Sequence, residues 1–208
     1  MRLSDGLHLL GGVHLHKTIS SMKFIAIVLS TFILFGCNQQ NKQQNGSSQQ
    51  DSLNHKENVS LIVSVQKKEK DQAPDFTWYD STGKQISFSE ISKGKPVLVN
   101  FWATWCGPCI AETPDIVKIN NEFKSKGALV IGISTDRDED ALNLVSEFVK
   151  EKNVKYPIVI DNGDLEEAFG GLRGYPTSFY IDKNGKVVKK LLGLQSKEKF
   201  ASEFEALL

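Results

Sequence analysis

Histidine and cysteine are scarce in this sequence, which limits the chemistry that its side chains can perform. The 208 residues include three cysteines and four histidines, and every histidine precedes the region that has the pattern of a folded domain: His8, His14, His16 and His55. A closed zinc site needs about four ligands and commonly draws on histidine. A Cys–His hydrolase needs a histidine beside its nucleophile. The absence of histidine excludes both kinds of site from the C-terminal region.

Neither sign of charge is in excess, because 25 basic residues balance 25 acidic ones. Proteins that bind nucleic acid carry an excess of Lys and Arg to neutralise phosphates, so no nucleic-acid partner is expected. Hydrophobic residues make up 40% of the chain, which suits one ordinary globular domain with additional segments.

The N-terminal apolar run, Phe24 to Phe35, is shorter than the roughly 20 residues that cross a bilayer. It follows Met22-Lys23 and has the proportions of the apolar region of a signal peptide. It ends in Leu34-Phe35-Gly36-Cys37, which resembles a bacterial lipobox, although Phe35 departs from the usual small or aliphatic residue. We expect cleavage before Cys37 and a lipid anchor on this cysteine; an uncleaved signal anchor is the alternative.

Composition divides the chain into three parts. Residues 1–36 are predicted to be an upstream extension and a lipoprotein signal peptide that starts at Met22, so the early histidines are not expected to form a metal site. Residues 37–70 begin with a stretch rich in Gln, Asn and Ser and are predicted to be a flexible tether. Val59 to Val65 within it is either a short strand or the end of the tether. Residues 71–208 are predicted to be the folded domain, which is long enough for its own core.

The predicted elements of the domain alternate between strands and helices. Strands are expected at 75–79, 86–88, 97–102, 128–133, 156–160, 177–181 and 187–191, and helices after Cys106 and at 138–152, 165–169 and 197–207. The acidic run Asp136 to Asp140 is interpreted as the start of one helix. This order predicts an α/β fold with a central mixed sheet, helices on both of its faces and an N-terminal β-hairpin.

The remaining two cysteines form the motif Cys106-Gly107-Pro108-Cys109, at the point where a buried strand turns into a helix. Unpaired N–H groups and the positive end of the helix dipole there favour thiolate over thiol. Lowering a thiol pKa from about 8.5 to about 7 raises the thiolate fraction from ~3% to ~50%, but the weaker nucleophile leaves only about a threefold gain in attack rate. The larger effect is on redox poise. The motif therefore predicts dithiol/disulfide exchange, with its direction left open.

Two non-catalytic interpretations of the cysteine pair compete with this one. Soft thiolates suit copper or zinc, so Cys106 and Cys109 could belong to a metal-binding chaperone; the missing third ligand argues against it, and no metal is expected. A purely structural disulfide is the other alternative. The loop between the two cysteines is too small for a disulfide to stabilise the fold much.

Three motifs of the domain match a known pattern: Ala73-Pro74-Asp75-Phe76, the run Asn100 to Cys109, and Gly174-Tyr175-Pro176-Thr177. Through them the domain resembles the thioredoxin superfamily, and within it the membrane-tethered TlpA/ResA-type thiol-disulfide oxidoreductases. The resemblance implies a thioredoxin-like three-layer fold. It also implies a redox-active disulfide that requires no other cofactor.

The resemblance also assigns expected roles to individual residues. Pro176 matches a cis proline that packs against the active-site disulfide, and the backbone of Tyr175 would pair with an extended substrate segment. Trp105, Gly107 and Pro108 would complete the surface that a substrate contacts. Glu112 matches an acidic position that could take the proton of Cys109; a solvated helix glutamate is the alternative. Asn100 replaces the buried Asp of cytosolic thioredoxins.

A peroxiredoxin-like thiol peroxidase would share the Ala73 to Phe76 entry. Peroxidases of that class need a threonine three residues before the reactive cysteine, whereas Thr104 lies two residues before Cys106. We therefore expect an extracytoplasmic thiol-disulfide oxidoreductase in a bacterial cell envelope, with protein thiols or disulfides as clients. A reductase that acts on client disulfides or on apocytochrome c, supplied by a membrane thiol donor, is favoured over a net oxidase.

Overall fold

The computed structural model describes residues 55–208, so the predicted signal peptide, Cys37 and most of the predicted tether lie outside the described residues. The strands are β1 (His55–Lys56), β2 (Val59–Gln66), β3 (Asp75–Tyr79), β4 (Gln85–Ser87), β5 (Val97–Trp102), β6 (Leu129–Ser134), β7 (Ile158–Ile160), β8 (Thr177–Ile181) and β9 (Val187–Leu192). The helices are α2 (Phe88–Ser92), α3 (Gly107–Lys124), α4 (Ala141–Glu151), α5 (Asp164–Ala168) and α6 (Lys197–Glu205).

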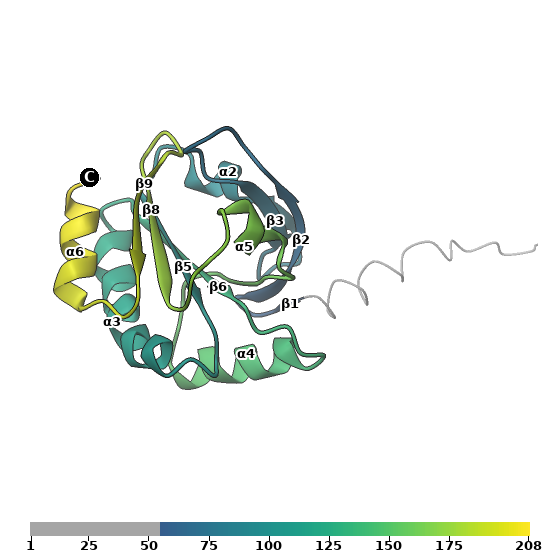
Figure 1. Cartoon of the computed structure of the whole chain (residues 1–208). Helices are drawn as coiled ribbons and strands as arrows, with labels where there is room; N and C mark the ends of the chain where they lie inside the picture. The colour runs from purple at the N-terminus through teal and green to yellow at the C-terminus, as the bar shows by residue number, and fades with distance from the viewer. Residues whose placement is uncertain (1–54) are drawn as a thin grey trace, which may run out of the picture. The chain divides into compact units, whose positions relative to one another are not determined.

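These strands form one mixed sheet in the order β4-β3-β2-β7-β6-β5-β8-β9, with β1 paired to β2 (Figure 1). The pairs β2–β7, β7–β6 and β6–β5 are parallel, and the outer pairs are antiparallel. Every residue of β5 is buried, as expected for a parallel strand covered on both faces. The predicted mixed sheet and the N-terminal hairpin β3–β4 are confirmed.

The helices pack on both faces of the sheet and enclose two apolar clusters. One cluster includes side chains of α3, α4 and α6, such as Ile116, Val145 and Phe204. The other includes Phe88 of α2 and Leu165 of α5. Figure 1 shows α3 beside α6 on one face of the sheet and α5 on the opposite face. The predicted three layers are therefore present.

The folded domain begins earlier than the predicted boundary at residue 71. Val59–Gln66 is a strand, and it lies inside the sheet between β3 and β7 rather than in a tether. Its first two residues, Val59 and Ser60, are buried, and the residues after them are half-buried or exposed. The sequence left open whether this segment is a strand or the end of the tether, because the pairing with β7, of Val59 with Ile158, joins segments that are far apart in the chain.

The topology gathers several loops at one edge of the sheet. The parallel strands β5, β6 and β7 all end at this edge, and β8, antiparallel to β5, begins there with Thr177 paired to Phe101. The segments that follow β5, β6 and β7 therefore lie close to the segment that precedes β8. Ligands and reactive groups of open α/β sheets are commonly found at this edge.

Candidate active site

Cys106 and Cys109 are joined by a disulfide where β5 gives way to α3. Cys106 is the N-cap of α3, and its sulfur accepts a hydrogen bond of 3.3 Å from the Cys109 N–H. The sulfur of Cys106 thus lies at the positive end of an 18-residue helix. Cys106 keeps 6% of its surface exposed and Cys109 only 1%, so Cys106 is the more accessible cysteine of the pair.

An aromatic rim borders the disulfide. Trp105 exposes 65% of its surface, and its ring meets the Tyr175 ring edge-on with centroids 5.9 Å apart. The Tyr175–Pro176 peptide bond is cis, as the resemblance implied. Gly107 and Pro108 are exposed in the first turn of α3. The fold therefore brings the predicted substrate-contacting residues of two distant segments to one place.

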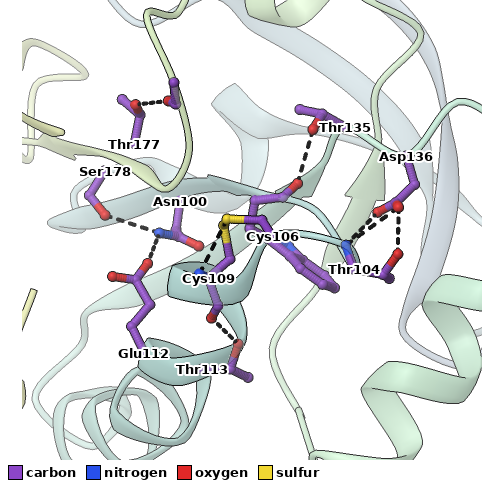
Figure 2. The surroundings of a disulfide bond; sticks show 12 residues. Asn100, Thr104, Cys106, Cys109, Glu112, Thr113, Thr135, Asp136, Thr177 and Ser178 are labelled. Carbon is purple, nitrogen blue, oxygen red and sulfur yellow. Dashed lines mark hydrogen bonds between the residues drawn. A yellow bond between two sulfur atoms is a disulfide. The ribbon is translucent and has the colours of Figure 1, made fainter. Parts of the chain in front are cut away.

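Glu112 lies one helical turn beyond Cys109 and is 2% exposed. Its Oε1 accepts a hydrogen bond of 2.9 Å from the Asn100 side-chain amide, and its Oε2 accepts one of 3.1 Å from the Gln195 N–H. Figure 2 shows Glu112 and Asn100 beside the disulfide. Burial raises the pKa of Glu112 to about 7, although both donors oppose the shift. The structure thus contradicts the alternative of a solvated helix glutamate.

Asn100 holds Glu112 from the neighbouring strand. Its amide nitrogen also donates to the Ser178 hydroxyl at 3.1 Å, so it links β5, α3 and β8. The sequence indicated only that Asn100 lacks the carboxylate of cytosolic thioredoxins. In the structure, its amide donates a hydrogen bond to the Glu112 carboxylate of α3. Gln195 and Ser178 were not predicted, because a backbone N–H after β9 and a small strand residue give no signal in the sequence.

Asp136 is the main residue of this edge that the sequence analysis misinterpreted. It was assigned to the start of a helix, but α4 begins only at Ala141, and Asp136 is 1% exposed. Its carboxylate accepts hydrogen bonds from the N–H and the hydroxyl of Thr104. Because the Thr104 hydroxyl donates to Asp136, this contact adds to the spacing argument against a peroxidase. The available signal was the position of Asp136 two residues after a buried strand, at the edge where loops converge.

Comparisons with known proteins agree with this geometry. A family model described as Redoxin matches residues 68–208. The chain belongs to the Redoxin family.

The similar proteins are named for thiol-disulfide exchange. The chain is 42% identical over 127 residues to the thiol-disulfide oxidoreductase ResA of Bacillus cereus. The matched region covers 61% of this chain and 71% of that relative. It is 36% identical over 121 residues to ResA of Bacillus subtilis, and this match covers 58% of this chain and 65% of that relative. A thioredoxin-family thiol:disulfide interchange protein of Chlorobium tepidum has a similar structure, with a TM-score of 0.60, 34% identity, and 67% of this chain and 97% of that one covered.

The predicted thioredoxin-like fold and the TlpA/ResA resemblance are thereby confirmed. This Redoxin-family chain is a thiol-disulfide oxidoreductase with the Cys106–Cys109 pair at its site, and its substrates are protein thiols and disulfides. Within residues 55–208, no three His, Cys, Asp or Glu side chains cluster in a way that could hold a metal ion. In the same residues, no helix combines the length and apolarity required to cross a bilayer.

The raised pKa of Glu112 predicts a pH-dependent cost to stability. The folded protein holds this proton up to about pH 7, whereas an ordinary glutamate releases it near 4.5. The cost is therefore absent below pH 4.5, grows between 4.5 and 7, and is constant above, where it amounts to roughly 3 kcal/mol. Glu112→Gln is expected to raise the free energy of unfolding of the oxidised protein by up to about 3 kcal/mol at pH 8 and to change it little at pH 4.

Denaturant titrations of both proteins at pH 4 and pH 8 check this expectation. The glutamine can keep the network, because the Asn100 amide can rotate to present its oxygen while the Gln195 N–H still donates to the new side chain. An equal change in stability at the two pH values would show that Glu112 has an ordinary pKa.

Proposed function

We propose that the protein acts as a reductase of client disulfides, with Cys106 as the attacking thiol. The observation that carries this proposal is the asymmetry of the pair. Cys106 caps the helix and is the more accessible cysteine. Cys109 is buried, and the carboxylate of Glu112, one helical turn further along α3, is buried as well. Such an arrangement suits one thiolate that meets a client and a second thiol that needs a base to become reactive.

In the reduced protein, the Cys106 thiolate attacks a sulfur of the client disulfide. A mixed disulfide forms, and the first client thiolate leaves. Glu112 then accepts the proton of Cys109, whose thiolate attacks the Cys106 sulfur. The Cys106–Cys109 disulfide forms, the second client thiolate leaves, and two electrons have passed to the client.

Clients would contact the rim formed by Trp105, Gly107 and Pro108 together with Tyr175 and Pro176. An extended client segment would pair with the backbone of Tyr175, as in strand addition. Client disulfides or the cysteines of apocytochrome c are the proposed substrates, in line with the TlpA/ResA resemblance. The disulfide itself is the only redox group that this scheme needs, so no further cofactor is proposed.

The proposed location is the outer side of a bacterial cytoplasmic membrane or the periplasm. The sequence of residues 22–37 supports export and lipid attachment. Because no soluble reductant pool is expected there, a membrane thiol protein would return electrons to the Cys106–Cys109 disulfide.

The anchor proposal predicts the behaviour of a Cys37→Ser variant. Expressed from the full chain in a bacterium, the wild type is expected in the membrane fraction with a lipid-modified Cys37 as its first residue. The variant is expected to lose the lipid and the cleavage before residue 37. Fractionation with mass spectrometry of the N-terminus checks this. An unmodified wild-type Cys37 within an uncleaved chain would favour the signal-anchor alternative.

The reductase proposal is tested by mixing the reduced protein with a peptide that contains one disulfide. We expect two peptide thiols for each protein oxidised, and much slower oxidation of a dithiol peptide by the oxidised protein. Faster oxidation than reduction would reverse the proposed direction. Rapid consumption of hydrogen peroxide with no peptide reduction would favour the peroxidase alternative.

A further inference from the structure

The segment after β6 contacts both halves of the site. Asp136 binds Thr104, two residues before Cys106, and the next residue, Arg137, pairs with Glu166 of α5, which accepts the Tyr175 hydroxyl. We propose that Asp136 and Arg137 are positioning residues: Asp136 fixes the Cys106 loop and Arg137 fixes the Tyr175–Pro176 loop. This inference rests on the proposed role of Cys106 as the attacking thiol.

The Asp136 carboxylate accepts hydrogen bonds from three donors, two of which belong to Thr104 of the cysteine loop. The Thr104 hydroxyl lies 2.6 Å from Oδ1, the Thr104 N–H lies 3.1 Å from Oδ2, and the Ser134 hydroxyl lies 2.6 Å from Oδ2. A buried carboxylate without such partners would be costly, and hydrogen bonds to a charged acceptor are about twice as strong as neutral ones. Thr104 is thus hydrogen-bonded to a buried carboxylate whose position is restricted.

The position of Cys106 follows from this anchor. Within the segment from Ala103 to Cys106, the Cys106 N–H donates to the Ala103 carbonyl at 3.2 Å, and the Cys106 carbonyl accepts the Ile110 N–H of α3 at 3.0 Å. In Figure 2, the Thr104–Asp136 pair lies on the other side of the disulfide from Glu112. The loop is therefore held from the strand side by Asp136, while α3 begins immediately after it. A misplacement of about 1 Å can reduce reactivity as much as ~100-fold.

Arg137 acts on the second half through Glu166. The guanidinium lies 2.7 Å from the Glu166 carboxylate, which accepts the Tyr175 hydroxyl at 2.9 Å. Arg137 also lies 3.5 Å from Asp161, which is fully buried and accepts the N–H groups of Leu165 and Glu166. The tyrosine whose ring meets Trp105 is thus held at its far end by a chain of charged groups that begins beside Asp136.

The two residues should affect different kinetic constants. Displacing the Cys106 loop slows the attack itself, whereas loosening the Tyr175 loop weakens the contact with the client and leaves the thiol in place. In a steady-state assay with a peptide disulfide and dithiothreitol, substitutions at Asp136 should therefore lower kcat. Substitutions at Arg137 should mainly raise KM.

The experiment for Asp136 uses the full chain in detergent and the single-turnover rate of attack on a fluorescent peptide disulfide. Asp136→Asn cannot accept the Thr104 N–H and both hydroxyls as a carboxylate does, and it is expected to slow attack by about 10- to 100-fold. Thr104→Val is the milder variant and should slow attack less, while Thr104→Ser should restore it. Asp80 offers a matched control, since it accepts the N–H and hydroxyl of Thr82 in the distant β3–β4 turn.

Asp80→Asn should lower the melting temperature without changing the attack rate. If Asp136→Asn and Thr104→Val lower stability but attack as fast as Asp80→Asn, the positioning role of Asp136 is refuted. If wild type itself shows no attack that depends on Cys106, the proposed function has failed instead. The two failures are therefore distinguishable.

For Arg137, the variant is Arg137→Gln, with Lys67→Gln as its control. Lys67 forms an exposed ion pair with Glu167, the neighbour of Glu166 on α5. Arg137→Gln is expected to raise KM for the peptide about fivefold with kcat within about twofold, whereas Lys67→Gln should change neither. A fall in kcat with unchanged KM, or equal effects of the two variants, would contradict the role of Arg137.

Discussion

Cys106→Ser is expected to abolish reduction of client disulfides, whereas Cys109→Ser should retain the first step and stop at a mixed disulfide. The reason is the division of roles: serine at 106 removes the thiolate that attacks, and serine at 109 removes only the thiol that releases the client. Incubation of each reduced variant with a peptide disulfide, followed by intact-mass analysis, measures the outcome. The Cys109→Ser protein should gain the mass of one peptide chain.

The two variants serve as controls for each other, because each keeps one cysteine of the pair. If the Cys106→Ser protein accumulated a peptide adduct on Cys109, Cys109 would be the attacking thiol and the proposed assignment to Cys106 would be wrong. Full turnover by either variant would show that the reaction does not need both cysteines, which would contradict the dithiol mechanism.

Glu112→Gln is expected to slow the resolution of the mixed disulfide by about 100-fold at pH 8, which is the lower part of the range for a positioned proton acceptor. Burial raises the pKa of Glu112 to about 7, so the ionised form that accepts a proton is lost below that pH. The wild-type rate should therefore fall about tenfold for each pH unit below 7. The wild-type rate should level off above pH 7. The variant should show no plateau near pH 7, because its rate follows the ionisation of the Cys109 thiol alone and keeps rising with pH.

Stopped-flow measurement of the second thiol released, from pH 5 to 9, gives both quantities. Glu122→Gln is the matched control, because Glu122 lies on the same helix but is exposed and paired with Lys197. Its rates should match the wild type. A Glu112→Gln profile that overlaid the wild type would remove Glu112 from the mechanism.

The local chemistry of the site was predictable from the sequence. The apolar run of β5 indicated a buried strand, the spacing of Cys106 and Cys109 placed the first sulfur at a helix start, and Glu112 fell one turn further on the same helix. The match of Gly174 to Thr177 with a known motif implied the cis peptide before Pro176. Each of these features depends on a few consecutive residues or on a recognisable motif.

What the sequence did not predict depends on contacts between distant segments. The acidic run after β6 matched a helix start, so Asp136 was not expected to bind Thr104, 32 residues earlier. The donation of the Gln195 N–H to Glu112 spans 83 residues and involves no characteristic side chain. Similarly, the sequence left β2 open as a strand or as the end of the tether, because its place between β3 and β7 is fixed only by the assembled sheet.

The reduction potential of the Cys106–Cys109 couple tests the central claim most directly. Full-length protein in detergent, equilibrated with glutathione and dithiothreitol buffers, would be scored by the fraction of the pair in disulfide form. The account predicts a value near or below about −250 mV, close to thioredoxin, so that electrons flow to client disulfides. A value above about −150 mV, near the DsbA-type oxidants, would contradict the proposed direction.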